Sequence, residues 1–214
     1  AGSSTNTHKA TWTQLALLYL AAVRIVLHKL LWGWRTPKPI EWKQARVLCL
    51  GLKGAGKSSL LRRASDATAA LSDIAPTTGF NVRVVLVQPD WKLEVWDVGG
   101  AAQTYWGRYV TYDTAALIWV VDATDEARVR ESGVNLAAIL RAEPRLRRLP
   151  LLVLCSRAEL GALDAGAAAQ ALGVAELQQQ LLILGPHQLE LVSAAGGRNI
   201  GRGLQWITQQ LSPS

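Results

Sequence analysis

The chain has 214 residues, of which 50% are hydrophobic and 18% are charged. This composition excludes a disordered chain and leaves room for one full domain with an appendage. The formal net charge of +7 is concentrated near the N-terminus, because residues 1–46 carry seven Lys and Arg residues against Glu41 alone. Since this basic excess adjoins a hydrophobic stretch, we expect it to attract anionic lipid and expect no binding of nucleic acid.

The N-terminal part of the chain is predicted in three pieces. Residues 1–11 are small and polar and are expected to be flexible. Residues 12–34 form a hydrophobic helix framed by tryptophans, and residues 35–43 form a basic linker with two prolines. The rest of the chain, residues 44–214, is predicted to be one globular domain.

The hydrophobic helix is predicted to bind membrane lipid. Trp12 and Trp32 are 20 residues apart, which corresponds to about 30 Å of helix, the thickness of a bilayer core. Arg24, His28 and Lys29 interrupt the stretch, and the side that bears Arg24 and His28 favours a helix lying in the interface. Spanning and in-plane binding both stay open, as does packing against a hydrophobic surface of another protein.

Strands and helices alternate through the globular part. Strands are expected at 46–50, 81–87, 91–98, 115–123, 150–156 and 187–194, and helices at 57–71, 125–142, 163–172 and 201–211. This order predicts an α/β sheet with right-handed crossovers and ligand chemistry at the carboxyl ends of the strands. Cys49 and Cys155 fall within apolar strands, so no disulfide is expected, and no Cys/His cluster has zinc spacing.

A glycine-rich sequence, GLKGAGKSS, follows the strand 46–50 and precedes a helix. It has the pattern G-x-x-x-x-G-K-S in the context that a phosphate-binding loop requires, which makes a chance glycine-rich turn the weaker reading. The backbone amides and the start of the helix would bind phosphate oxygens, Lys57 would reach the β- and γ-phosphates, and Ser58 would bind Mg²⁺. The predicted phosphate-binding residues are Gly51, Lys53, Gly54, Ala55, Gly56, Lys57, Ser58 and Ser59.

Two further motifs follow: PTTGFNV at residues 76–82 and WDVGG at residues 96–100. With the glycine-rich loop, they closely resemble the Arf and Arf-like small GTPases over roughly residues 44–212. The resemblance implies a Ras-like P-loop NTPase domain with a mostly parallel six-stranded sheet and helices on both faces. It also implies bound GTP or GDP and one Mg²⁺.

The resemblance assigns roles to individual residues. It implies that Thr77 reaches Mg²⁺ when the γ-phosphate is present, that Asp97 completes the metal site, and that the amide of Gly100 contacts the γ-phosphate. A set of aromatic residues would contact a protein effector or the subunits of a complex, although such side chains also occur in ordinary cores. This aromatic set consists of Phe80, Trp96 and Tyr109. Residues 81–98 would slide to couple nucleotide state to the N-terminal helix.

The sequence departs from the family at the position after WDVGG, where Ala101 replaces the glutamine that orients the attacking water. The guanine-reading N-K-x-D also becomes SRAE, residues 156–159. We expect Glu159 to accept hydrogen bonds from the base, Arg157 to cover the base, and Ser156 to lose the structural bonds of asparagine. Ser193 and Ala194 match the second base-contacting loop.

Two functional interpretations stay open. The first is a membrane-associated Arf-like switch that binds nucleotide and hydrolyses it slowly or not at all, with its domain facing the cytosol. The second is a non-catalytic structural subunit of a membrane complex, which holds a nucleotide permanently or none. Because the N-terminus is poor in acidic residues, the mitochondrial inner membrane is an alternative location.

Overall fold

The computed structural model describes residues 12–32, 41–72, 74–101, 103–161 and 163–212. The chain divides into two compact units, Ala1–Ile40 and Glu41–Ser214. The predicted flexible residues 1–11 and most of the predicted linker lie outside the described residues. The first unit is therefore described by its helix alone, and the second by nearly its whole length.

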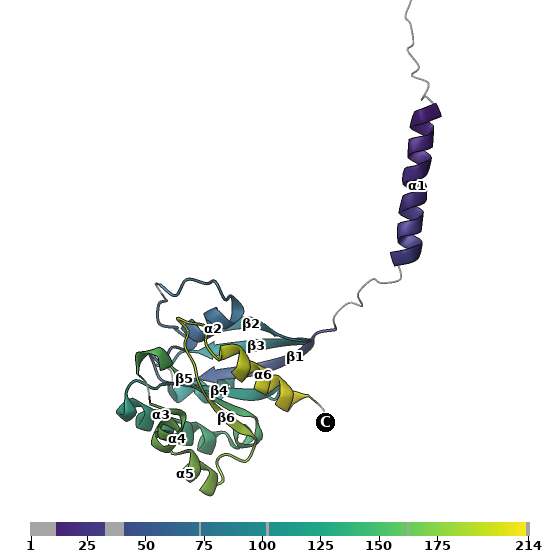
Figure 1. Ribbon diagram of the computed structural model, residues 1–214. Coiled ribbons are helices and arrows are strands. Elements are labelled where there is room, and N and C mark those ends of the chain that lie inside the picture. Colours follow the sequence, from purple (N-terminus) through teal and green to yellow (C-terminus); the bar gives the residue numbers. More distant parts are fainter. Residues whose placement is uncertain (1–11, 33–40, 73, 102, 162, 213–214) are drawn as a thin grey trace, which may run out of the picture. The chain divides into compact units, whose positions relative to one another are not determined.

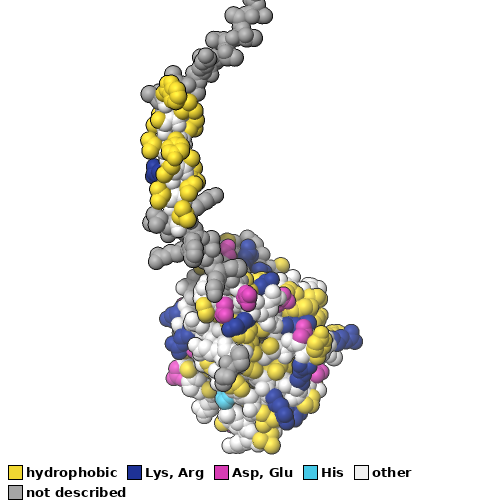
Figure 2. Space-filling model, turned by 90° about the vertical axis from the view of Figure 1, so that its right-hand side faces the viewer, with side chains coloured by type: hydrophobic (Ala, Val, Ile, Leu, Met, Phe, Trp, Pro, Cys, Tyr) yellow, Lys and Arg dark blue, Asp and Glu magenta, His cyan; other side chains and the backbone are white. Residues whose placement is uncertain are grey.

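The predicted N-terminal helix is present as α1, Trp12–Trp32 (Figure 1). Hydrophobic side chains cover much of its visible surface (Figure 2). Large exposed hydrophobic side chains occur along its whole length, at Trp12, Leu15, Leu17, Leu18, Tyr19, Leu20, Val23, Ile25, Val26, Leu27 and Leu30. Within the described part of the chain, no helix is both long enough and apolar enough to cross a bilayer.

The second unit contains the expected six-stranded sheet, in the order β2-β3-β1-β4-β5-β6. Only β2 runs antiparallel to its neighbour, and the other pairs are parallel. The strands are β1 (Lys43–Leu50), β2 (Phe80–Val87), β3 (Trp91–Val98), β4 (Thr114–Asp122), β5 (Leu151–Ser156) and β6 (His187–Leu191). The central strands β4 and β5 are almost entirely buried, as their continuous apolar sequences predict.

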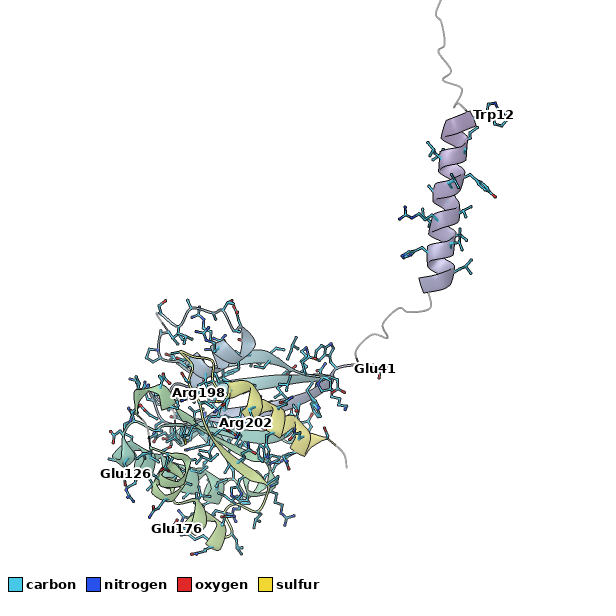
Figure 3. The ribbon with its side chains drawn as sticks, in the orientation of Figure 1. Trp12, Glu41, Glu126, Glu176, Arg198 and Arg202 are labelled. Atoms are coloured by element: carbon cyan, nitrogen blue, oxygen red, sulfur yellow. The ribbon has the colours of Figure 1, made fainter. Side chains whose placement is uncertain are left out.

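Helices cover both faces of this sheet (Figure 1). On one face, α2 (Lys57–Ser65) and α6 (Ile200–Leu211) pack on one hydrophobic cluster. On the other face, α3 (Glu126–Ala142), α4 (Ala165–Leu172) and α5 (Val174–Gln179) pack on a second cluster. Glu126, labelled in Figure 3, opens α3 after the N-cap Asp125.

The predicted helix 57–71 is wrong in its length, because α2 already ends at Ser65. The next residue, Asp66, adopts an extended conformation, and its carboxylate accepts hydrogen bonds from the amide and hydroxyl of Thr68. Such a local turn competes with helical hydrogen bonding. The residues up to β2 are therefore free to approach the carboxyl ends of the strands, where segment 74–79 lines a cavity.

The other differences are small. The strand β6 stops at Leu191 instead of 194, because Ser193 pairs with Arg198 across a turn. Short helices not expected from the sequence are α5 and the 3₁₀ helices η2 (Gln103–Tyr109), η3 (Pro144–Arg148) and η4 (Ala158–Leu160). Both cysteines are free and buried, as expected.

Candidate nucleotide-binding site

The glycine-rich loop leaves the carboxyl end of β1 and leads directly into α2. Gly56 is the N-cap of α2 and has a φ of 89°, a left-handed conformation that favours glycine. The first backbone amides of α2 have no hydrogen-bond acceptor within the helix. They are therefore available beside the glycine-rich loop. This local geometry is a ready-made binding site for anionic oxygens.

Lys57 lies beneath this loop. Its side chain is only 6% exposed, and its Nζ donates hydrogen bonds to the carbonyl oxygens of Gly51 at 2.7 Å and Leu52 at 3.1 Å. Burial lowers the pKa of Lys57. The loop thus encloses the ammonium group of Lys57. The negative oxygens of a polyphosphate bound to the loop would stabilise this buried positive charge.

Three oxygen-bearing side chains converge beside Lys57. The hydroxyl of Ser58 donates to Oδ2 of Asp97 at 2.5 Å and shares a hydrogen bond of 2.9 Å with the hydroxyl of Thr77. Asp97 is fully buried, burial raises its pKa, and its Oδ1 has no hydrogen-bond partner among the described residues. An unpartnered buried carboxylate oxygen beside two hydroxyls fits Mg²⁺, which prefers oxygen ligands.

The segment after β3 is pressed against the loop. A Cβ added at Gly100 would lie 2.3 Å from the amide nitrogen of Lys53, so only glycine fits there. The indole of Trp106 donates a hydrogen bond of 3.1 Å to the carbonyl oxygen of Gly99 and anchors this segment from below. The predicted γ-phosphate contact, Gly100, therefore lies directly beside the predicted phosphate loop.

A cavity of about 570 Å³ opens over these groups. Its walls come from the glycine-rich loop, from segment 74–79, from the residues after β3 and from Arg157. The predicted residues that line it are Lys53, Gly54, Gly56, Lys57, Ser58, Ser59, Thr77, Gly100 and Arg157. A second cavity of about 600 Å³ lies between α2, β2 and α6, but none of the predicted phosphate-binding residues line it.

Two arginines hold the outer turn of the loop. Arg157 forms an ion pair with Asp122 and donates to the carbonyl oxygen of Gly54 at 3.0 Å. Arg128 donates to the carbonyl oxygen of Lys53 at 2.6 Å and lies 3.9 Å from the same carboxylate. Sequence reasoning missed Asp122 and Arg128, although the polar sequence DATD, which begins at Asp122, the last residue of β4, was a usable signal for Asp122.

The expectation that Ser156 loses its structural bonds is wrong. Its hydroxyl donates a hydrogen bond of 2.8 Å to the carbonyl oxygen of Ala55, so a short side chain still ties the strand β5 to the loop. Serine suffices because β5 ends close to the loop: a Cβ added at Gly56 would lie 3.5 Å from the Ser156 hydroxyl. Glu159 is exposed on η4 and is free to meet a ligand from solvent.

The second predicted base-contacting loop adjoins η4, because the amide of Ala158 donates to the carbonyl oxygen of Val192 at 3.2 Å. The Ser193 hydroxyl accepts a hydrogen bond of 3.0 Å from the amide of Gly196. The carbonyl oxygen of Ala194 accepts one of 2.9 Å from Nε of Arg63 on α2. The structure therefore brings both predicted base-contacting segments to the same edge of the sheet.

The predicted aromatic set also forms one cluster. The rings of Phe80 and Trp96 stack at 4.8 Å, and Tyr109 lies 5.4 Å from Phe80. The Arg46 guanidinium lies 3.7 Å from the centroid of Trp96 on the same cluster. Phe80 is 44% exposed, and the outward-facing side chains of the edge strand β2 are exposed as well. The cluster is thus accessible at one edge of the sheet.

A mostly parallel six-stranded sheet, with a G-x-x-x-x-G-K-S loop between its first strand and the next helix, defines a Ras-like small GTP-binding protein. Residues 37–211 match the ADP-ribosylation factor family. The chain belongs to this family, and the expected binding of GTP or GDP is a property of the family.

Curated relatives agree with this assignment. The chain is 34% identical over 171 residues to ADP-ribosylation factor-like protein 3 of Chlamydomonas reinhardtii, covering 78% of this chain and 91% of the relative. It is 33% identical over 174 residues to ADP-ribosylation factor-like protein 2 of Drosophila melanogaster, covering 79% and 89%.

A solved structure is similar in fold. The Arl6 BBS3 small GTPase from Trypanosoma brucei, with bound nucleotide analogue GppNp, matches with a TM-score of 0.65 and 22% identity. The match covers 78% of this chain and 96% of that chain. At this identity the likeness supports the Ras-like fold.

Proposed function

We propose that this chain is a membrane-associated Arf-like protein that binds guanine nucleotide with Mg²⁺ and hydrolyses GTP slowly or not at all. The observation that carries the proposal is the convergence of Ser58, Thr77 and Asp97 beside the buried Lys57. These residues supply what a metal-bound polyphosphate needs. The next residue after Gly100 is Ala101, whose methyl group cannot orient a water molecule.

The loop does most of the binding in this proposal. Its amides and the positive end of α2 hold the phosphate oxygens, and Lys57 neutralises the β- and γ-phosphates. When bound, Mg²⁺ neutralises further charge on the phosphates. Ser58 and Thr77 would hold the metal through their hydroxyls, and Asp97 would orient it. Because Thr77 belongs to the loop before β2, its bond to the metal would couple nucleotide state to β2 and the aromatic cluster.

Base recognition is assigned to the SRAE segment and the loop after β6. The Arg157 guanidinium is tied to Asp122 and Gly54, which would leave its stem beneath the base. Glu159 would accept hydrogen bonds from the guanine edge, and the amide of Ala194 would meet the guanine oxygen. A glutamate places its carboxylate one methylene further out than aspartate, so we expect a weaker preference for guanine.

The N-terminal helix and the aromatic cluster would serve two different partners. The exposed apolar side chains of α1 would enter lipid, with the basic residues around it attracting anionic headgroups at the cytosolic face. Phe80, Trp96 and Tyr109 would bind an effector, since stacked aromatic rings bury much area with few rotatable bonds.

A second candidate function, a structural subunit that never exchanges its nucleotide, is favoured by a different observation. Arg128 and Arg157 already hold the outer turn of the loop through Asp122, with protein groups alone. These contacts would let the protein itself fix part of the shape of the loop. This candidate would use α1 and the aromatic cluster as permanent contacts.

The deciding experiment is to identify by chromatography the nucleotide released when the purified full chain is denatured, and then to measure single-turnover GTP hydrolysis with Mg²⁺. The proposal expects bound GTP or GDP and very slow phosphate release, with acceleration of about tenfold or more in Ala101→Gln. A wild-type rate typical of small GTPases would contradict slow hydrolysis. An empty site, with no uptake of GTP or GDP, would contradict nucleotide binding and favour the structural subunit.

A further inference from the structure

Tyr105 lines the cavity, although the sequence assigns no role to it. It belongs to η2, and it lines the cavity together with Gly100 and Ala101. The Gly100 amide is the predicted contact of a terminal phosphate. Tyr105 thus shares the wall of the cavity with the predicted contact of the terminal phosphate, the group by which a triphosphate differs from a diphosphate.

The backbone of η2 is fixed by Trp106, the residue that follows Tyr105. Trp106 is 1% exposed, donates its indole hydrogen bond to the carbonyl oxygen of Gly99, and packs edge-on against Trp119 at 5.4 Å. Tyr105, its neighbour, is 51% exposed. One residue thus anchors η2 in the core while the previous one faces the cavity, so the position of Tyr105 does not depend on a loose loop.

The ring of Tyr105 is also supported from its own helix. A 3₁₀ helix has three residues per turn, so side chains three positions apart lie over one another. The guanidinium of Arg108 accordingly lies 4.7 Å from the centroid of the Tyr105 ring. This cation–π contact favours one orientation of the ring at the cavity wall.

We propose that Tyr105 belongs to the nucleotide site and that its phenolic hydroxyl donates a hydrogen bond to the terminal phosphate of a nucleoside triphosphate. The inference rests on the nucleotide binding of the proposed function. The methyl side chain of Ala101 offers no polar group to a phosphate. The phenol of Tyr105, in contrast, is a hydrogen-bond donor on a long, rigid side chain. Because a diphosphate lacks the accepting group, Tyr105 would favour binding of the triphosphate over the diphosphate.

The test compares the affinities of the full chain for a fluorescent, non-hydrolysable GTP analogue and for fluorescent GDP, in the presence of Mg²⁺. In Tyr105→Phe, which keeps the ring and its contact with Arg108, we expect the affinity for the triphosphate to fall about tenfold while that for GDP is unchanged. The matched control is Tyr112→Phe, since Tyr112 is 85% exposed and does not line the cavity. It should leave both affinities unchanged.

Two results would overturn the inference. An unchanged triphosphate affinity in Tyr105→Phe would mean that the hydroxyl makes no contact, and an equal loss for both nucleotides would mean that the residue acts only on the shape of the site. In both cases the proposed function survives, because the wild type still binds nucleotide. Failure of the wild type to bind either nucleotide would overturn the proposed function together with the inference.

Discussion

The Ser58 hydroxyl donates a hydrogen bond of 2.5 Å to the Asp97 carboxylate, although the two residues are 39 positions apart in the sequence. Ser58 lies in the first turn of α2 and Asp97 lies near the end of β3, so the contact joins the glycine-rich loop to the segment before Gly100. Ser58 lines the cavity, whereas Asp97 is fully buried, and burial raises the pKa of Asp97. A divalent cation is the natural group to compensate such a buried carboxylate.

We therefore expect Asp97→Ala to remove most of the Mg²⁺ dependence of nucleotide binding. The affinity of the wild type for GDP should fall about tenfold or more when Mg²⁺ is replaced by EDTA. Losing a group that holds or orients a bound metal typically lowers affinity by about that factor. The variant should bind equally weakly in both conditions. The matched control, Glu131→Gln on the exposed face of α3, should behave as wild type. A variant that retains the full response to Mg²⁺ would remove Asp97 from the metal site.

The arginine pair around Asp122 makes a prediction about kinetics. Arg157→Ala removes the bond to the Gly54 carbonyl and one partner of the buried Asp122. The loop should then open more often, and fluorescent GDP should dissociate about tenfold faster, the effect of one charge-assisted hydrogen bond. Arg198→Ala, at an exposed position outside the cavity (Figure 3), serves as control. Equal dissociation rates in wild type and Arg157→Ala would show that the bond does not hold the loop.

The parts of the site that follow a strand or a glycine pattern could be predicted from the sequence. Lys57 and Ser58 lie in a local motif, and Asp97 lies near the carboxyl end of a recognisable strand, so their convergence follows from parallel topology. The roles of Thr77 and Asp97 were predicted from the resemblance of PTTGFNV and WDVGG to the Arf family, although sequence alone gives no distance between Thr77 and Ser58.

The parts that depend on tertiary contacts were not predictable. Arg128 and Arg157 both reach Asp122 only because β4, α3 and β5 converge over the loop, and no local pattern encodes which arginines meet this carboxylate. Ser156 reaches Ala55 because the ends of two strands lie close, which residue size alone could not reveal. The short α2 was missed because the Asp66 turn outweighs the helix-favouring sequence around it.

A glycine in α3 gives a prediction about stability. A Cβ added at Gly133 would lie 2.3 Å from the carbonyl oxygen of Leu172, so Gly133→Ala must push α3 and α4 apart. We expect a loss of about 1–3 kcal/mol in the free energy of unfolding, as for other overpacked contacts. In Gly201→Ala, where nothing lies within 4 Å, the same change should stabilise α6 by about 0.5–1 kcal/mol. Chemical denaturation of both variants checks this, and a neutral Gly133→Ala would contradict the close packing.

The two buried thiols predict how stability depends on pH. Burial raises the pKa of Cys155 to about 12, and burial together with the nearby Asp97 raises the pKa of Cys49 further. Above the ordinary thiol pKa of 9.0 the unfolded chain loses these protons while the folded chain keeps them. The unfolded state then binds fewer protons, so stability falls with rising pH by about 1.4 kcal/mol per pH unit for each thiol.

Denaturation between pH 9 and pH 11 measures this slope. Other groups also titrate in this range, so the informative quantity is the difference between wild type and Cys155→Val, which keeps the buried volume. The variant should lose stability about 1.4 kcal/mol per pH unit less steeply than wild type. Equal slopes would show that Cys155 ionises as easily in the folded chain as in the unfolded one.

The N-terminal helix gives a prediction about which of its sides contacts lipid. At about 100° per residue, Leu15 and Val26 lie opposite Arg24 on α1, whereas Leu20 lies near it. The side chains of Leu15, Leu20 and Val26 are all exposed. If α1 lies in the interface with Arg24 towards water, Leu15→Glu and Val26→Glu should each weaken binding to vesicles of phosphatidylcholine and phosphatidylserine, and Leu20→Glu should be tolerated. An equal loss of binding in all three variants would contradict an interfacial helix with Arg24 towards water. Co-sedimentation with vesicles measures the difference, and wild-type protein that stays in the supernatant would contradict lipid binding by α1.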